Sequence, residues 1–150
     1  MADFAAPPDL LFNRERVTDP TAYAEQVGCA SWLSLTGPEF AAMEGGMSYE
    51  QVEAAVPESR NVISDPPRVM DLELARQHVA ALDALPRPTL VTCRSGPRAS
   101  ATVYMYAGLK AGAAPEDVVA AAERDGAPCA ASDELKAWIA YSMSALRNED

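Results

Sequence analysis

The sequence is poor in the residues that hold metals and disulfides. Only three cysteines and one histidine occur among its 150 residues. Cys29, Cys93 and Cys129 are odd in number and show no metal-ligand spacing. No dinucleotide-binding glycine pattern is present. We therefore expect no disulfide framework, no metal and no cofactor, and a reducing cytoplasmic environment.

Basic residues are also scarce. Twelve Lys and Arg stand against 22 Asp and Glu, a formal net charge of −10. A nucleic-acid partner is not expected, because phosphate backbones are bound by broad basic patches. No apolar run approaches the ~20 residues that cross a bilayer, and the start MADFAAPPDLLF lacks the pattern of a signal peptide. We expect no membrane partner, and small anions or single phosphoryl groups are the more plausible ligands.

What the chain does contain is an alternation of strand-like and helix-like segments. Residues 1–9 are rich in Ala and Pro and predict a flexible arm, followed by a single domain over residues 10–150. Short strands are predicted at residues 10–12, 29–35, 60–64 and 88–93. Helical patterns are predicted at residues 17–28, 48–56, 71–85, 99–112, 114–126 and 132–147. This order favours an α/β domain with a largely parallel central sheet flanked by helices.

The stretch VTCRSGPRAS, residues 91–100, concentrates scarce residues at the end of the clearest strand. Ligands of open α/β sheets bind beyond the carboxyl ends of the strands. The turn after Cys93 is expected to direct its amides and the positive end of the next helix inward. Gly96 allows the bend and Arg98 offers a planar fork for oxygens. The loop therefore indicates an anion site beside a cysteine nucleophile.

The sequence CRSGPRAS resembles the CRSGTRS loop of the β-lactamase-hydrolase-like phosphatase domains, a bacterial branch of the tyrosine/dual-specificity phosphatase fold. The resemblance extends over residues 10 to about 140, including VTDPTAYAEQVGCASWLSL and the segment from RNVISDPP to the nucleophile strand. It implies a cysteine-phosphatase-like fold. It also implies a phosphatase, similar to the protein tyrosine phosphatases, that hydrolyses phosphate monoesters of small molecules or proteins.

The resemblance also implies residue roles. Cys93 would attack phosphorus and form a phosphocysteine, and Arg98 with the loop amides would hold the oxygens. Asp65, 28 residues earlier in DPP, would be the general acid. Ser100 or Ser95 could donate to the departing sulfur. The remaining loop residues, Arg94, Gly96, Pro97 and Ala99, would complete the anion-binding set.

Two alternatives remain open at this point. The familiar tyrosine phosphatases place five residues between Cys and Arg, whereas four separate Cys93 from Arg98, and Thr92 replaces the histidine that often precedes the cysteine. Four-residue spacing is typical of rhodanese-like sulfurtransferases, which would use a Cys93 persulfide. Rhodanese-type flanking motifs are missing, which favours the phosphatase. A non-catalytic phosphate- or anion-binding module is the third interpretation.

Other polar residues are assigned structural roles. His78 is expected at an exposed or core-edge position of a helix. Cys29 is expected in the core and Cys129 at the surface. Glu39 is interpreted as a solvated loop acid, and Arg94 as a surface charge or a salt-bridge partner of Asp65.

Overall fold

A four-stranded parallel sheet organises the protein, whose computed structural model describes residues 4–149. The strands are β1 (Leu10–Phe12), β2 (Ser31–Ser34), β3 (Glu58–Asn61) and β4 (Thr89–Thr92). Their spatial order is β1-β4-β2-β3, so β4 lies between β1 and β2. The α/β class with a parallel central sheet is confirmed.

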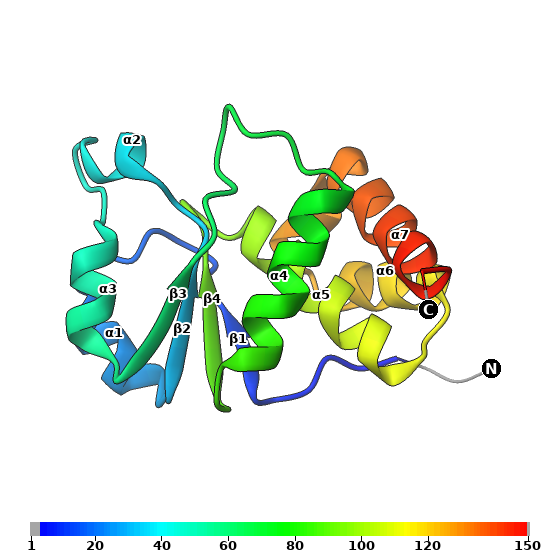
Figure 1. The fold of residues 1–150 in the computed structure, drawn as a ribbon, viewed down its shortest axis with the longest axis horizontal. Helices are drawn as coiled ribbons and strands as arrows, with labels where there is room; N and C mark the ends of the chain where they lie inside the picture. Colours follow the sequence, from blue (N-terminus) through cyan, green and yellow to red (C-terminus); the bar gives the residue numbers. More distant parts are fainter. Residues whose placement is uncertain (1–3, 150) are drawn as a thin grey trace.

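Helices cover both faces of the sheet (Figure 1). One face carries α1 (Pro20–Val27) and α3 (Tyr49–Ala55), with the short α2 (Pro38–Ala41) beyond the strand ends. The other face carries α4 (Leu72–Ala84), α5 (Pro97–Ala111), α6 (Pro115–Arg124) and α7 (Asp133–Arg147), with a 3₁₀ turn at Pro128–Ala131. None of the helices within residues 4–149 is long and apolar enough to cross a membrane.

The side chains of the strands alternate between two cores. Leu33 of β2 and Val91 of β4 face the cluster formed with α4 to α7, whereas Trp32 and Leu90 face the cluster formed with α1 and α3. All four are fully buried. Successive side chains of a strand point to opposite faces, so a sheet covered on both sides needs these continuous apolar runs.

The strand order explains why the helices divide as they do. The chain moves in one direction across the sheet from β1 to β2 and β3, and then returns from β3 to β4. Because parallel crossovers are right-handed, the returning helix α4 must lie on the face opposite to α1 and α3. The connection after β4 also enters the α4 side, whereas those after its neighbours β1 and β2 enter the other side. The carboxyl end of β4 is therefore a topological switch point, where open α/β sheets bind ligands.

The start of the described chain is packed. Residues 1–9 were predicted to be a flexible arm; residues 1–3 lie outside the described part, but Phe4 is buried. Its ring lies edge-on to Tyr104 at 6.4 Å, and its carbonyl accepts a hydrogen bond from Arg124. An aromatic ring among alanines and prolines is enough to hold residues near it on the core.

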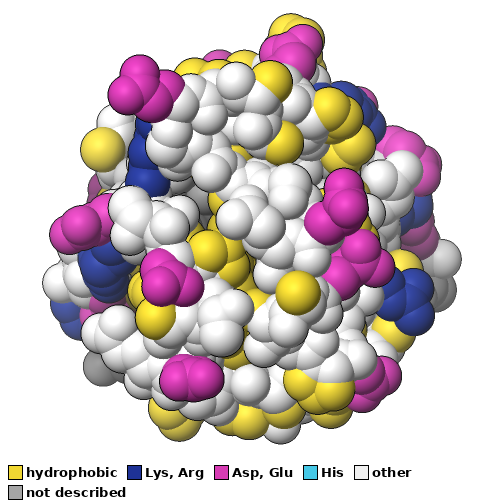
Figure 2. Space-filling view, turned by 90° about the vertical axis from the view of Figure 1, so that its left-hand side faces the viewer, with side chains coloured by type: hydrophobic (Ala, Val, Ile, Leu, Met, Phe, Trp, Pro, Cys, Tyr) yellow, Lys and Arg dark blue, Asp and Glu magenta, His cyan; other side chains and the backbone are white. Residues whose placement is uncertain are grey.

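The surface over α1 to α3 is predominantly acidic. Figure 2 shows acidic side chains scattered over this face, with basic side chains toward its edges. This distribution fits the formal net charge of −10.

Candidate functional site

The loop formed by Cys93 to Arg98, called the cysteine loop below, lies at the switch point. It runs from the end of β4 into the first turn of α5. Cys93 is buried, with 5% of its surface exposed, and its Sγ accepts a hydrogen bond from the Gly96 amide at 3.0 Å. Gly96 is the N-cap of α5, and Pro97 is the first residue of that helix. The sulfur therefore sits at the positive end of a 15-residue helix.

Asn13 fixes the backbone of Cys93 from the neighbouring strand. Its side-chain oxygen accepts from the Cys93 amide at 3.2 Å, and its Nδ2 donates to the Cys93 carbonyl at 3.1 Å. Nδ2 also donates to the backbone carbonyl of Glu15. Asn13 was not among the site residues predicted from the sequence. The only signal available was a polar residue directly after the apolar run of β1.

Gly96 occupies a position that only glycine fits. Its φ of 120° is strained for residues with a side chain. A Cβ there would lie 2.4 Å from the Asn13 carbonyl oxygen. The close approach of the two loops is therefore the reason for a glycine three residues after Cys93.

Arg98 is anchored through one nitrogen of its guanidinium. Nη1 donates to the carbonyl of Ser64 and, at 2.6 Å, to that of Arg68. Within residues 4–149 the hydrogen bonds found for Arg98 use Nη1 alone, so Nε and Nη2 remain available to an oxyanion. Burial lowers the Arg98 pKa. Charge interactions with Cys93, Glu134 and Asp65 act in the opposite direction and raise it.

Asp65 and Arg94 form an ion pair across the loop. The Asp65 side chain is 5% exposed, and its Oδ2 accepts from Arg94 Nε at 3.1 Å and lies 3.0 Å from Nη2. The Arg94 guanidinium also lies over the ring of Phe40, 5.7 Å from its centroid. Arg94 was expected to be either a surface charge or a salt-bridge partner of Asp65, and the structure shows the salt bridge. The Asp65 carboxylate is thus held by Arg94, which is itself a residue of the cysteine loop.

A cavity of about 190 Å³ joins these groups. Its lining consists of Asp65, Pro66, Cys93, Arg94, Ser95, Pro97 and Arg98. The predicted loop residues Gly96, Ala99 and Ser100 do not line it, although Gly96 donates to the sulfur.

Ser100 is turned away from the sulfur. It is fully buried, its hydroxyl donates to the Pro97 carbonyl at 3.0 Å and accepts from the Cys129 amide at 3.0 Å. Ser95 is the exposed hydroxyl that lines the cavity. Cys129, expected at the surface, is fully buried because the 3₁₀ turn docks on α5 through this bond. Cys29, expected in the core, is only partly buried.

His78 is part of the framework behind the site. It was expected at an exposed or core-edge position of a helix, and that prediction is wrong. His78 is fully buried, with Nε2 2.8 Å from Ser64 Oγ and Nδ1 2.9 Å from Thr102 Oγ1. Ser64 Oγ donates to the Val62 carbonyl, so Nε2 must carry the proton and Nδ1 must accept from Thr102. Burial, with a smaller effect of the Arg68 charge, lowers the His78 pKa to about 3. A neutral imidazole thereby ties the Asp65 segment to α5.

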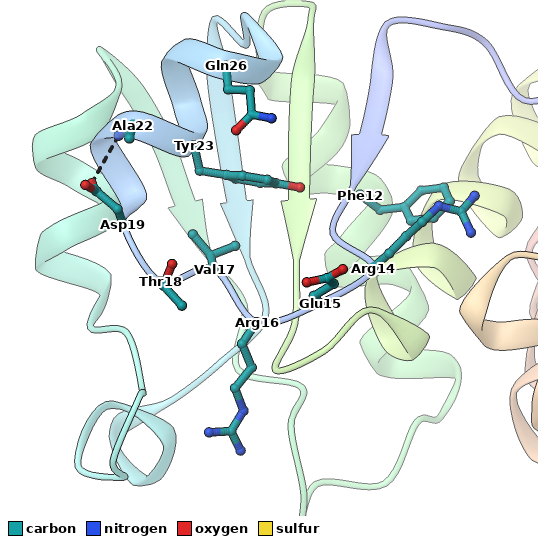
Figure 3. A pocket seen from close by; sticks show the side chains of 10 residues that line it. All are labelled: Phe12, Arg14, Glu15, Arg16, Val17, Thr18, Asp19, Ala22, Tyr23 and Gln26. Atoms are coloured by element: carbon teal, nitrogen blue, oxygen red, sulfur yellow. Dashed lines mark hydrogen bonds between the residues drawn. The ribbon is translucent and has the colours of Figure 1, made fainter.

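A larger cavity of about 510 Å³ lies beside α1, away from the cysteine (Figure 3). Three of its polar side chains form hydrogen bonds within the protein. Asp19 caps α1 through the Ala22 amide, Arg14 donates to the Gly126 carbonyl and Arg16 donates to the Glu44 carbonyl. Figure 3 shows Arg16 pointing away from Tyr23 and Gln26. Size alone does not make this the candidate site, because Cys93, Asp65 and Arg98 line a different cavity. No cluster of three metal-ligating side chains occurs in the described chain.

Comparison with solved structures places the fold among phosphatase structures. A candidate phosphatase from Neisseria meningitidis aligns with a TM-score of 0.67 at 13% identity, over 95% of this chain and 99% of that one. The catalytic domain of the PP-IP phosphatase SIW14 from S. cerevisiae aligns with a TM-score of 0.62 at 13% identity, covering 99% and 96%. A candidate phosphatase of the DUF442 group from Shewanella putrefaciens aligns with a TM-score of 0.58 at 23% identity, covering 99% and 86%.

No protein-family model matches the chain, and no curated protein sequence matches it. At these identities the likeness establishes the fold alone. The predicted cysteine-phosphatase-like architecture is confirmed at that level.

Proposed function

We propose that the protein is a metal-independent, cysteine-dependent phosphatase that hydrolyses phosphate monoesters through a phosphocysteine intermediate. One observation carries the proposal: Cys93 and Arg98 of the cysteine loop and Asp65 of the segment after β3 line the same small cavity at the start of α5. Nucleophile, oxyanion fork and acid are the groups that this reaction requires. The phosphatase descriptions of the structural neighbours support it.

In the first step the Cys93 sulfur attacks phosphorus, and the bond between phosphorus and the leaving oxygen breaks. The free N–H groups of Arg98 and the amides at the start of α5 hold the phosphoryl oxygens. Asp65 gives its proton to the leaving oxygen. In the second step Asp65 takes a proton from water, which attacks the phosphocysteine and releases phosphate and the thiolate.

The ion pair between Asp65 and Arg94 has a place in this sequence. Asp65 must reach the leaving oxygen to act as the acid, whereas in this structure its carboxyl group is bound by Arg94. A phosphate dianion beside the loop competes for Arg94, since arginine binds phosphate through two N–H groups. Arrival of the substrate thus releases the Asp65 carboxyl from Arg94 and leaves it beside the leaving oxygen.

The test pairs two assays on the wild type, Cys93→Ser and Asp65→Asn. We expect aryl phosphate hydrolysis in the wild type and a loss of at least about 10³-fold in Cys93→Ser. Asp65→Asn should lose about 10²- to 10⁴-fold with a poorly leaving alcohol and far less with a nitrophenol. Asp133→Asn, an equal change on a fully exposed side chain of α7, should have no effect.

Rhodanese-like sulfur transfer is the competing function, favoured by the four residues between Cys93 and Arg98. In that reaction the thiolate takes the outer sulfur of thiosulfate, releases sulfite, and passes the sulfur to cyanide. The second assay measures this transfer. Turnover in that assay alone would replace the phosphatase proposal, and oxyanion binding without turnover in either assay would indicate a binding module.

A further inference from the structure

A second cavity adjoins the cysteine cavity at the general acid. It measures about 330 Å³ and shares Asp65 and Pro66 with the first. Its other lining residues come from the start of α2 and from the segment before α4: Gly37, Pro38, Glu39, Ile63, Pro67 and Arg68. This proposal rests on the proposed function, in which Asp65 stands at the leaving oxygen. The rest of the leaving alcohol must then extend past Asp65, toward this second cavity.

The walls of the second cavity are apolar and open to solvent. Ile63 is 48% exposed, and three prolines, Pro38, Pro66 and Pro67, are exposed beside it. Exposed apolar groups gathered at a cavity indicate a surface that an apolar ligand can cover. Proline also loses little conformational freedom when it is covered, because its side chain is already fixed.

Gly37 brings the apolar wall next to the acid. A Cβ at Gly37 would lie 2.9 Å from Ile63 Cγ2 and 3.5 Å from Asp65 Oδ1. Both side chains therefore contact the same glycine, one on the path of the leaving group and the other at the leaving oxygen. Without this glycine Ile63 would be pushed out of place.

The charges of the second cavity are unequal. The Arg68 guanidinium is paired with Asp71 at 2.9 Å, and its backbone carbonyl accepts from Arg98. Glu39 is exposed, and no ion pair of its carboxylate is found among residues 4–149. The cavity thus carries a negative charge that is not neutralised locally. A second phosphate or carboxylate on the leaving group would meet like charge there.

We propose that this second cavity binds the leaving group and selects monophosphate esters of apolar alcohols, aromatic or alkyl, over esters that carry further anionic groups. Ile63 and Glu39 are its specificity-determining residues. Ile63 binds apolar substituents, and Glu39 repels anionic ones.

The experiment compares kcat/KM for phenyl phosphate, 4-butylphenyl phosphate and 4-carboxyphenyl phosphate. Glu39→Lys should raise the carboxyphenyl-to-phenyl ratio about three- to tenfold over the wild type. Ile63→Ser should lower the butylphenyl-to-phenyl ratio about five- to tenfold. The ratio within one enzyme cancels differences in the folded fraction, and comparing each ratio with that of the wild type cancels the intrinsic reactivity of the esters.

Two matched variants serve as controls. Glu25→Lys changes the net charge equally on an exposed position of α1, and Val69→Ser removes an apolar side chain, 65% exposed, that lines neither cavity. Neither should change either ratio. Unchanged ratios in Glu39→Lys and Ile63→Ser, or equal shifts in the controls, would overturn the proposal.

Failure of the proposed function is detected separately. If the wild type hydrolyses none of the three esters, the phosphatase assignment is wrong. The leaving-group site is then decided by calorimetric binding of the three esters to Cys93→Ser, alone and combined with Glu39→Lys or Ile63→Ser. The same ratios of Kd would support the site, and equal Kd values would exclude it.

Discussion

His78 offers a test of the framework that needs no substrate. The chain has one histidine, and its pKa in the native state is lowered from 6.5 to about 3 by burial. At pH values between 3 and 6.5, His78 therefore binds a proton in the unfolded chain but not in the native state. The sign follows: His78 contributes stability that is complete above pH 6.5 and is lost as the pH falls toward 3.

The magnitude follows from the same two pKa values. Each pH unit between them changes the free energy of unfolding by about 1.4 kcal/mol. Between pH 7 and pH 4.5 the imidazole should therefore account for a loss of about 3 kcal/mol. Other titrating groups change stability too, so the effect must be read as a difference between two proteins.

Urea unfolding of the wild type and of His78→Gln over this pH range isolates the effect. Glutamine keeps an N–H donor near the position of Nε2 and stays uncharged at every pH. The free energy of unfolding of the wild type minus that of the variant should rise with pH at about 1.4 kcal/mol per unit up to pH 6.5 and then level off. A pH-independent difference would falsify the buried neutral imidazole.

Three further variants, at two positions, test the cysteine loop. Gly96→Ala should cost about 2–4 kcal/mol of stability, because it combines a φ of 120° with a 2.4 Å approach to the Asn13 carbonyl oxygen; a melting temperature equal to the wild type would refute this. Asn13→Ala should cost about 2–4 kcal/mol, because it leaves the buried amide and carbonyl of Cys93 without their partner. Asn13→Asp should restore only the bond to the amide, and a fully stable Asp variant would contradict the assigned geometry.

Local chemistry in the sequence predicted much of the framework. Asp19 caps α1, Pro20 begins it and Gly28 ends it, and Ser48 with Gln51 forms the capping box of α3, in agreement with the helices predicted at residues 17–28 and 48–56. These signals work because each depends on residues three or four positions apart. The placement of Asp65 and the cysteine loop at one edge also follows locally, since both come after parallel strands.

Features that depend on distant partners could not be predicted in the same way. Strand β3 was expected at residues 60–64 but lies at Glu58–Asn61, because an edge strand with alternating exposed residues lacks the apolar run that reveals a buried strand. Asn13 acts through a contact 80 residues away along the chain. The burial of His78 depends on hydroxyls from two other elements.

The cysteine loop also contains the start of the most deeply buried helix, since residues 99–108 of α5 are all buried. We therefore expect a ligand bound at this loop to stabilise the whole domain against unfolding, and not only a local surface segment. A ligand at a hundred times its Kd would add about 2.7 kcal/mol to the global stability. Melting temperature is therefore a suitable readout for screening phosphate esters and oxyanions against this protein.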